Sequence, residues 1–271
     1  MKSNPPDALA DAIARARPRL GRVASTVLFF ETIGSTNDEA AKQSAAGGRS
    51  AEGLVVVADE QTAGRGRRGH AWFSPAGSGL YVSVVLAPAT ATTDPGRATT
   101  LLTLAAGVAL AEGIEQAAGL RIDLKWPNDL LVCRRKLGGI LAESSGSGDR
   151  SDTVVVGYGI NVRPTAFPPE LRDRATSLES ELGRAIDRHH VLAETLAALS
   201  RRYEDLLAGR FDAILDAWRD RAPGASGARV TWTSKAGESS GVTAGIDDLG
   251  ALLVRVADRV ERIVSGEVAW I

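Results

Sequence analysis

The spacing of apolar and polar residues divides this chain into many short strands and a few helices. Apolar, β-prone runs predict strands over residues 26–31, 54–58, 80–86, 121–132 (with a turn inside), 136–144 and 153–160. Helical spacing predicts helices over residues 7–17, 99–118, 189–207 and 211–221, and a more polar helix with Ser35 as its N-cap. The helices are too few and the strands too clustered for a regular alternating βαβ domain, so the pattern predicts an α+β fold.

The character of the chain changes after Arg221. Residues 222–227 form a linker-like stretch of Ala, Pro, Gly and Ser. About 45 residues of short β-prone runs follow, at 229–233, 241–246, 252–256, 259–264 and 267–270. Short strands separated by Gly- and Asp-containing turns predict a small barrel. We therefore expect an N-terminal arm (1–25), a main domain (26–222) and a small C-terminal domain (223–271).

Composition narrows the classes of protein. The 271 residues carry a formal net charge of −1, which argues against binding nucleic acid through bulk positive charge. A single cysteine, Cys133, excludes an internal disulfide, and three histidines are too few and badly spaced for a zinc site. The longest apolar stretch, 98–111, predicts a core helix and not a membrane span. Because the N-terminus lacks a hydrophobic signal region, a cytoplasmic protein is expected.

The candidate chemistry centres on a basic, glycine-punctuated loop, Gly64-Arg65-Gly66-Arg67-Arg68-Gly69. Glycine lets backbone approach a ligand closely, and arginine grips phosphate or carboxylate oxygens in pairs. The loop formally matches the G-x-G-x-x-G dinucleotide fingerprint, but no helix can start directly after it because Pro75 and two glycines follow. The alternatives are a solvated basic loop and an anion site, and the adjacent aromatic Trp72 favours the second.

Four further polar segments interrupt apolar runs, and each admits two interpretations. Lys125-Trp126-Pro127-Asn128-Asp129 offers a carboxylate for Mg²⁺, or a turn residue bonded to its own backbone. Lys136, followed by two glycines, is a cation beside closely approachable backbone, or a surface lysine at a bulge. Glycines at 157 and 159 suggest close backbone contact within a strand that ends at Asn161, and Ser35-Thr36-Asn37 is a binding segment or only a helix cap.

Together these motifs resemble the biotin–protein ligases. The segments 35–38, Gln61 with 64–69, 125–129, 136–140 and 157–161 occur in the family's order and approximate spacing, and the β-rich tail also fits. The resemblance implies a catalytic domain like that of class II aminoacyl-tRNA synthetases, with a mixed sheet flanked by helices, and an SH3-like C-terminal barrel. It also implies a two-step reaction, in which biotin and ATP form biotinyl-AMP and a lysine of a carrier domain then accepts the biotinyl group.

The resemblance also assigns expected roles to individual residues. Lys136, Arg65 and Arg67 are the expected catalytic cations. The residues expected to bind biotin are Ser35, Thr36, Asn37, Gln61, Gly64, Arg65, Lys136, Gly157 and Gly159. Those expected to bind ATP are Arg67, Trp72, Asn128 and Asn161, with Asp129 as the expected Mg²⁺ ligand. A loop that orders over the acyl-adenylate would exclude water, so residues 63–72 are expected to be mobile in the free enzyme.

The expected partner is the biotin carboxyl carrier domain of an acyl-CoA carboxylase, and the expected state is a monomer or weak homodimer. Many members of the family carry an N-terminal winged-helix domain that binds DNA. Only about 25 residues precede the matching region here, so DNA binding of that kind is not expected. The competing interpretations are a lipoate–protein ligase, which shares the architecture and the adenylation chemistry, and a nucleic-acid-binding module. Cys133 is expected to pack in the strand or turn before Lys136.

Overall fold

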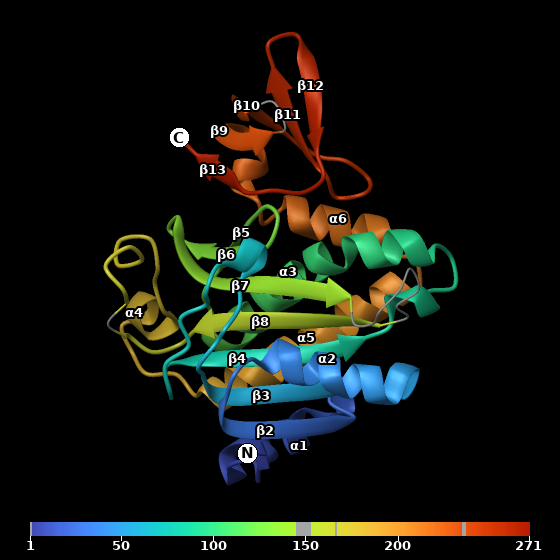
Figure 1. The fold of residues 1–271 in the computed structure, drawn as a ribbon, viewed down its shortest axis with the longest axis vertical. Helices are drawn as coiled ribbons and strands as arrows, with labels where there is room; N and C mark the ends of the chain where they lie inside the picture. The colour runs from blue at the N-terminus through green and yellow to red at the C-terminus, as the bar shows by residue number, and fades with distance from the viewer. Residues whose placement is uncertain (1, 145–152, 166, 235–236) are drawn as a thin grey trace.

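Two β-sheets organise the computed structural model, which describes residues 2–144, 153–165, 167–234 and 237–271 (Figure 1). The larger sheet has eight strands in the order β1-β2-β3-β4-β8-β7-β6-β5. Only β2 and β3 pair in parallel, joined by the helix α2, and the other neighbours pair antiparallel, which confirms the predicted mixed sheet. The strand bounds are β1 Lys2–Ser3, β2 Thr26–Ile33, β3 Leu54–Gln61, β4 Gly79–Leu86, β5 Asp123–Lys125, β6 Asp129–Val132, β7 Arg135–Ser144 and β8 Val154–Asn161.

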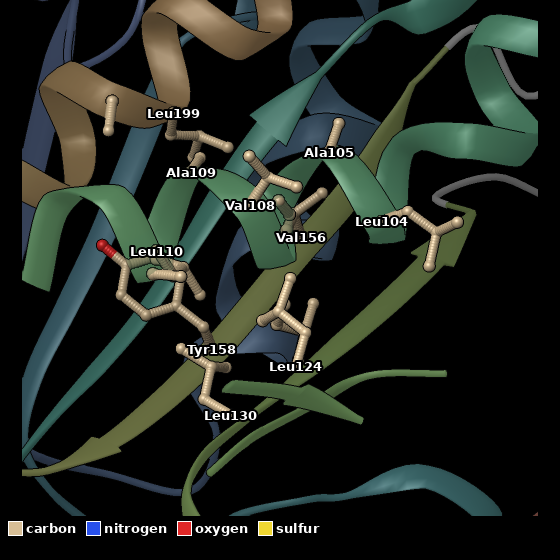
Figure 2. Close-up of a cluster of buried hydrophobic side chains, with 14 of the residues drawn as sticks. Leu104, Ala105, Val108, Ala109, Leu110, Leu124, Leu130, Val156, Tyr158 and Leu199 are labelled. Atoms are coloured by element: carbon tan, nitrogen blue, oxygen red, sulfur yellow. The ribbon is translucent and has the colours of Figure 1, made fainter. Parts of the chain in front are cut away.

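Helices cover both faces of this sheet because its strands are apolar on both sides. Along β3, Val55 and Val57 join the core beneath the long helices, whereas Val56 and Ala58 join a smaller cluster beneath α2. The helix α3 packs along α5, and its residues Leu104 to Leu110 meet strand residues such as Leu124 and Val156 (Figure 2). The helix bounds are α1 Asp7–Ala16, α2 Thr36–Gly47, α3 Pro95–Ala118, α4 Leu178–Leu182, α5 Arg188–Leu207 and α6 Phe211–Arg219.

The helix α3 has the length and apolar composition of a membrane span. Its most apolar 18-residue window has a mean hydropathy of 1.3, and 72% of that window is buried inside the protein. The uninterrupted apolar stretch at 98–111 is shorter than a membrane span, but the whole helix meets the criteria of length and mean hydropathy. Its apolar surface is covered by α5, α6 and the sheet, so it forms the predicted core helix.

The N-terminal segment is part of the main core. The strand β1 extends the large sheet by pairing Lys2 with Phe30 of β2. The helix α1 buries Leu9, Ala12 and Ala16, and Leu20 follows with no exposed surface. The segment expected as an arm therefore adds an edge strand and a packed helix to the main domain.

The C-terminal segment forms a second, antiparallel sheet of five strands in the order β12-β11-β10-β9-β13. These strands correspond to the five runs predicted from sequence: β9 Ser226–Ser234, β10 Gly237–Ile246, β11 Leu252–Val256, β12 Arg259–Ile263 and β13 Val268–Trp270. The linker-like stretch before them is a packed 3₁₀ turn, Pro223–Ala225, with Ala222 and Ala225 buried. A Cβ added at Gly224 would lie 2.4 Å from the ring of Trp270, so this stretch has a packing role.

The hairpin between β6 and β7 corrects the expectation for Cys133. Cys133 and Arg134 both adopt left-handed backbone conformations, with φ of 48° and 66°, as a two-residue type I′ turn requires. The cysteine is exposed at this turn, so it is not packed as expected. Its position places Arg134 at the edge of the pocket described below.

An ion pair between the N-terminal segment and α5 predicts a specific acid sensitivity. Arg19 donates two hydrogen bonds of 2.7 Å to Glu194, and these bonds lower the pKa of that glutamate. A carboxyl whose pKa falls on folding stabilises the folded state above its unfolded pKa, and that stability is lost as the pH falls through the folded pKa. Because Arg19 is 52% exposed, we expect Glu194→Gln to cost only ~1 kcal/mol at pH 7.

Urea unfolding of Glu194→Gln at a series of pH values from 7 to 3 would measure this effect. The variant is expected to show a shallower loss of unfolding free energy below about pH 5 than the unmodified protein. Glu31→Gln, at an exposed carboxyl of β2, is the matched control. Parallel pH profiles for the Glu194 variant and the unmodified protein would contradict the assignment.

Candidate active site

A pocket of about 540 Å³ lies between the large sheet, the glycine-arginine loop at 64–69 and the C-terminal sheet. Nearly all the residues predicted to form a site line it. They are Ser35, Thr36, Asn37, Gln61, Arg65, Arg67, Trp72, Asn128, Asp129, Lys136, Gly157, Gly159 and Asn161. Gly64 lies behind the lining, where an added Cβ would come within 2.6 Å of Ser74 Oγ and Trp72 O. The fold therefore brings together predicted site residues up to 126 positions apart, from Ser35 to Asn161.

One end of the pocket is formed by a buried network of neutral polar groups. Gln61 Oε1 accepts hydrogen bonds from the backbone N–H of Thr36 at 2.8 Å and from its hydroxyl at 3.0 Å. Gln61 Nε2 donates to Ser74 Oγ at 3.0 Å, and Ser83 Oγ lies 2.8 Å from Thr36 Oγ1. Such a network is rigid because each member is held by the next.

Of the two interpretations of Ser35, a helix cap or part of a binding segment, its side chain does not serve the first. The residue occupies the N-cap position of α2 as predicted, but its side chain makes no capping hydrogen bond. Gln61, which arrives from β3, accepts from the first helical N–H in its place. The buried side chain of Ser35 instead lines the pocket.

Asn37 joins this network to the strands β7 and β8. Its Oδ1 accepts from Ser83 Oγ at 2.6 Å, and its Nδ2 donates to Glu143 Oε2 at 2.8 Å and to Leu141 O at 3.3 Å. A Cβ added at Gly157 would lie 1.9 Å from Asn37 Oδ1. Glycine at 157 is therefore required by the close approach of the Asn37 carboxamide to β8.

The glycine-arginine loop folds back on itself as a narrow hairpin. Gly66 N donates to His70 O at 2.7 Å, Trp72 N donates to Gly64 O at 2.8 Å, and an isolated β-bridge joins Arg65 to Ala71. Only one 3₁₀ turn, Arg67–Gly69, occurs in it. The absence of a helix directly after this loop confirms that it is not a dinucleotide fingerprint.

The two leading arginines of the loop point to different partners. Arg65 makes two hydrogen bonds to Glu143, at 3.0 and 2.7 Å, and an ion pair with Asp38 at 2.8 Å. Arg67 Nη1 is 3.4 Å from both Asn128 Oδ1 and Gly266 O. Burial lowers the pKa of Arg67, and Asp129 opposes this shift, but a guanidinium stays charged at neutral pH.

Lysines gather at the same end of the pocket as Arg67. Lys136 Nζ pairs with Asp129 Oδ1 at 2.6 Å and lies 5.6 Å from the centre of the Trp72 ring. Burial lowers the pKa of Lys125, with Asp129 raising it and Lys136 lowering it further. Two ammonium groups and a guanidinium thus gather around the Asp129 carboxylate, with Glu267 as a second acidic neighbour of Arg67 and Lys125. The cations of the pocket outnumber its carboxylates, which leaves an excess of positive charge available to an anion.

Trp72 lies against two glycines of neighbouring strands. An added Cβ would come within 2.2 Å of its Nε1 at Gly159 and 3.5 Å of its ring at Gly139. Its indole N–H is buried and has no hydrogen-bond partner within the described residues. A buried donor without a partner at a pocket wall is a candidate contact for a ligand.

The two asparagines expected to bind ATP are also bonded to the backbone. Asn128 Nδ2 donates to Ile140 O at 2.7 Å, and Asn161 Nδ2 donates to Thr176 O at 2.9 Å. The second bond fixes the segment before α4, which Lys136 also holds through backbone bonds to Arg174 and Thr176. Both amides line the pocket with these donors already engaged.

Several residues that line the pocket or bond to its lining were not singled out from the sequence. Ser83 and Glu143 bond directly to Asn37, and Trp270 of β13 closes the pocket from the C-terminal sheet. Lys125 Nζ and Arg134 Cζ lie 5.4 and 5.0 Å from the centre of the Trp270 ring. Ser83 carried a readable signal, as a lone polar residue in an apolar strand, but Glu143 and Trp270 carried none.

The described residues contain no cluster of three or more His, Cys, Asp or Glu side chains that could enclose a metal ion. Asp129 presents a carboxylate 2.6 Å from the Lys136 ammonium, among the cations of the pocket. Mg²⁺ in nucleotide sites commonly takes one or two protein carboxylates and completes its shell with phosphate oxygens and water. The donor set therefore fits a magnesium ion carried by a nucleotide, and does not fit a metal held by protein side chains alone.

Comparisons with known proteins agree on one family. Residues 29–161 match the model of the biotin/lipoate A/B protein ligase family, and residues 225–269 match the model of the biotin protein ligase C-terminal domain. A bifunctional ligase/repressor from Bacillus subtilis is 38% identical over 89% of this chain and 73% of its own length. A biotin–[acetyl-CoA-carboxylase] ligase from Paracoccus denitrificans is 38% identical over 82% of this chain and 90% of its own length.

A solved structure shows the same fold. The biotin protein ligase from Aquifex aeolicus in complex with biotin and ATP superposes with a TM-score of 0.77 and is 29% identical in sequence. The superposition covers 91% of this chain and 99% of that one. It therefore includes both the large sheet and the C-terminal sheet.

Proposed function

Because this chain belongs to the biotin–protein ligase family, we propose that it condenses biotin with ATP and transfers the biotinyl group to a lysine of a carrier domain. In the first step the biotin carboxylate attacks the α-phosphate of ATP, which releases pyrophosphate and leaves biotinyl-AMP. In the second step the lysine amine attacks the acyl carbon, and AMP leaves.

One observation carries the proposal: a single pocket joins a buried neutral polar network to a cluster of cations. Its lining includes seven Arg and Lys residues against three Asp and Glu residues, in a chain whose formal net charge is −1. A carboxylate and a polyphosphate repel each other, and fixed positive charge is required to bring them together. The charge on this protein is therefore concentrated where two anions would meet.

The neutral end of the pocket suits the ureido ring of biotin. That ring has two N–H donors and one carbonyl acceptor, and Ser35, Thr36, Asn37 and Gln61 present hydroxyl and amide groups of both kinds. These groups are held in place by Ser74, Ser83 and Glu143. Neutral donors and acceptors are appropriate because the ring carries no charge.

The cationic end suits the carboxylate and the phosphates. Lys136, Lys125 and Arg67 would neutralise charge that develops as the carboxylate and the α-phosphate approach. Trp72 offers a flat ring beside Lys136 for the nucleotide, with Asn128 and Asn161 nearby. Asp129 would hold a magnesium ion bound with ATP, and such an ion neutralises phosphate charge.

Incubation of the protein with biotin, MgATP and a biotin carboxyl carrier domain tests the proposal. Intact-protein mass spectrometry is expected to show a gain of one biotinyl group on the carrier, dependent on both ATP and biotin. Lipoate replaces biotin in a parallel reaction, because the matched family model also covers lipoate ligases. An unmodified carrier, or a carrier modified by lipoate and not by biotin, would refute the proposal.

A further inference from the structure

We propose that Glu143 is a positioning residue that ties the glycine-arginine loop to the neutral end of the pocket. The effect on catalysis rests on the proposed function, whereas the tie itself rests on the contacts alone. Glu143 is near the end of β7 and bonds at once to Arg65 of the loop and to Asn37 at the start of α2. Three segments distant in sequence therefore meet at one carboxylate.

The geometry of this contact is specific. Arg65 Nη1 donates to Glu143 Oε1 at 3.0 Å, and Nη2 donates to Oε2 at 2.7 Å, so the guanidinium and the carboxylate face each other in a two-bond pair. Asn37 Nδ2 donates to the same Oε2 at 2.8 Å. Each carboxylate oxygen is thereby engaged, and the carboxylate cannot rotate without losing a bond.

The Asn37 side of the contact is fixed, and the Arg65 side is adjustable. Asn37 is 5% exposed and is also held by Ser83 and Leu141. Arg65 is flanked by Gly64 and Gly66, whose wide backbone freedom gives the loop many conformations. Glu143 selects one of these conformations by anchoring Arg65 to a rigid part of the fold, which limits the mobility expected for residues 63–72 in the free enzyme.

This arrangement gives Arg65 a different role from Arg67. The Arg65 guanidinium already faces the carboxylates of Glu143 and Asp38, so its charge is compensated within the protein. Arg67 instead has the side chain of Asn128 and a backbone carbonyl as neighbours. We therefore assign the phosphate contact to Arg67 and the placement of the loop to Arg65 with Glu143.

Isolated surface ion pairs contribute little to stability. The test therefore compares the Arg65–Glu143 pair with an exposed ion pair elsewhere in the protein. Glu204 accepts a hydrogen bond of 2.9 Å from Arg22, is 44% exposed and is not among the residues that line the pocket, which makes Glu204→Gln the matched control. Glu143→Gln removes the charge and keeps the size of the side chain. Glu143→Ala removes both hydrogen-bonding oxygens.

The first measurement is limited trypsin digestion of the ligand-free protein, with cleavage after Arg65, Arg67 and Arg68 mapped by mass spectrometry. Cleavage rates follow the population of the open loop when opening is fast. We expect the loop to be cleaved about five- to tenfold faster in Glu143→Gln, and faster still in Glu143→Ala. The cleavage rate of Glu204→Gln is expected to equal that of the unmodified protein. The melting temperature of each variant is measured alongside. Unchanged loop cleavage in both Glu143 variants would overturn the proposal, whatever reaction the protein catalyses.

The second measurement is a double-mutant cycle with Arg65→Gln, read as the half-life of enzyme-bound biotinyl-AMP after a chase and as KM for biotin. If Glu143 acts through Arg65, each single variant shortens the half-life and the double variant is no worse than Arg65→Gln alone. Multiplied effects in the double variant would overturn the coupling. If the unmodified protein fails to form biotinyl-AMP, the proposed function is refuted. The digestion result would still show whether Glu143 holds the loop in place.

Discussion

Replacing Lys136 by alanine is expected to lower the rate of biotinyl-AMP formation by ~10²–10³-fold while the protein stays folded. Lys136 is the second residue of β7, and its side chain projects into the pocket. Its Nζ lies 2.6 Å from Asp129 Oδ1 and 5.6 Å from the centre of the Trp72 ring. Without Lys136, Asp129 would lose its direct ion pair, and its negative charge would oppose the approach of the two anionic substrates of the proposed reaction.

Pyrophosphate release in a single turnover measures this step directly. Lys42→Ala, at an exposed lysine of α2, is the matched control and is expected to retain full activity. The side chain of Lys136 is 38% exposed and its backbone bonds do not involve Nζ, so the melting temperature is expected to change little. Pyrophosphate release at the normal rate from Lys136→Ala would remove this residue from the mechanism.

The secondary structure was largely predictable because apolar periodicity sets it locally. The strand at 54–58 and the helix at 99–118 were expected from their spacing, and the structure extends them to Leu54–Gln61 and Pro95–Ala118. The extensions occur at polar ends, such as Asp59 to Gln61, where the apolar signal stops but pairing with β2 continues. Tertiary pairing thus lengthens elements beyond the pattern that predicts them.

The residues that line the pocket were largely predictable from the sequence, but the contacts between them were not. Five motifs indicated the segments that converge, and the fold brings them to one cavity. The sequence could not show that Arg65 would face Glu143, 78 positions away, or that Trp270 would close the pocket from a second sheet. Contacts of this range depend on the order of strands in the sheet, and no local pattern encodes that order.

The glycines of β8 show how a sequence signal becomes clear only in three dimensions. Two glycines in an apolar strand suggested close approach of backbone to a ligand. The structure shows that their missing side chains are first occupied by protein groups, the carboxamide of Asn37 over Gly157 and the indole of Trp72 over Gly159. These two side chains form walls of the pocket, so the glycines shape the site through them.

Replacing Gly157 by alanine adds a single methyl group, yet we expect it to weaken biotin binding strongly. The new Cβ would lie 1.9 Å from Asn37 Oδ1, and Asn37 is buried and bonded to Ser83, Glu143 and Leu141. The carboxamide has to leave this network, and overpacking of this kind costs about 1–3 kcal/mol of stability. We expect KM for biotin to rise by at least ~tenfold, which corresponds to 1.4 kcal/mol.

Thermal unfolding and biotin titration of the first step separate the two effects. Gly107→Ala in α3 is the matched control, because an added Cβ there meets Leu124 at 3.6 Å, an ordinary contact distance. Alanine is also the better helix former, so this variant is expected to keep its affinity for biotin and to gain up to ~1 kcal/mol of stability. Since the pocket walls move only in the Gly157 variant, equal KM values for biotin in the two variants would show that Asn37 does not hold the ring of the substrate.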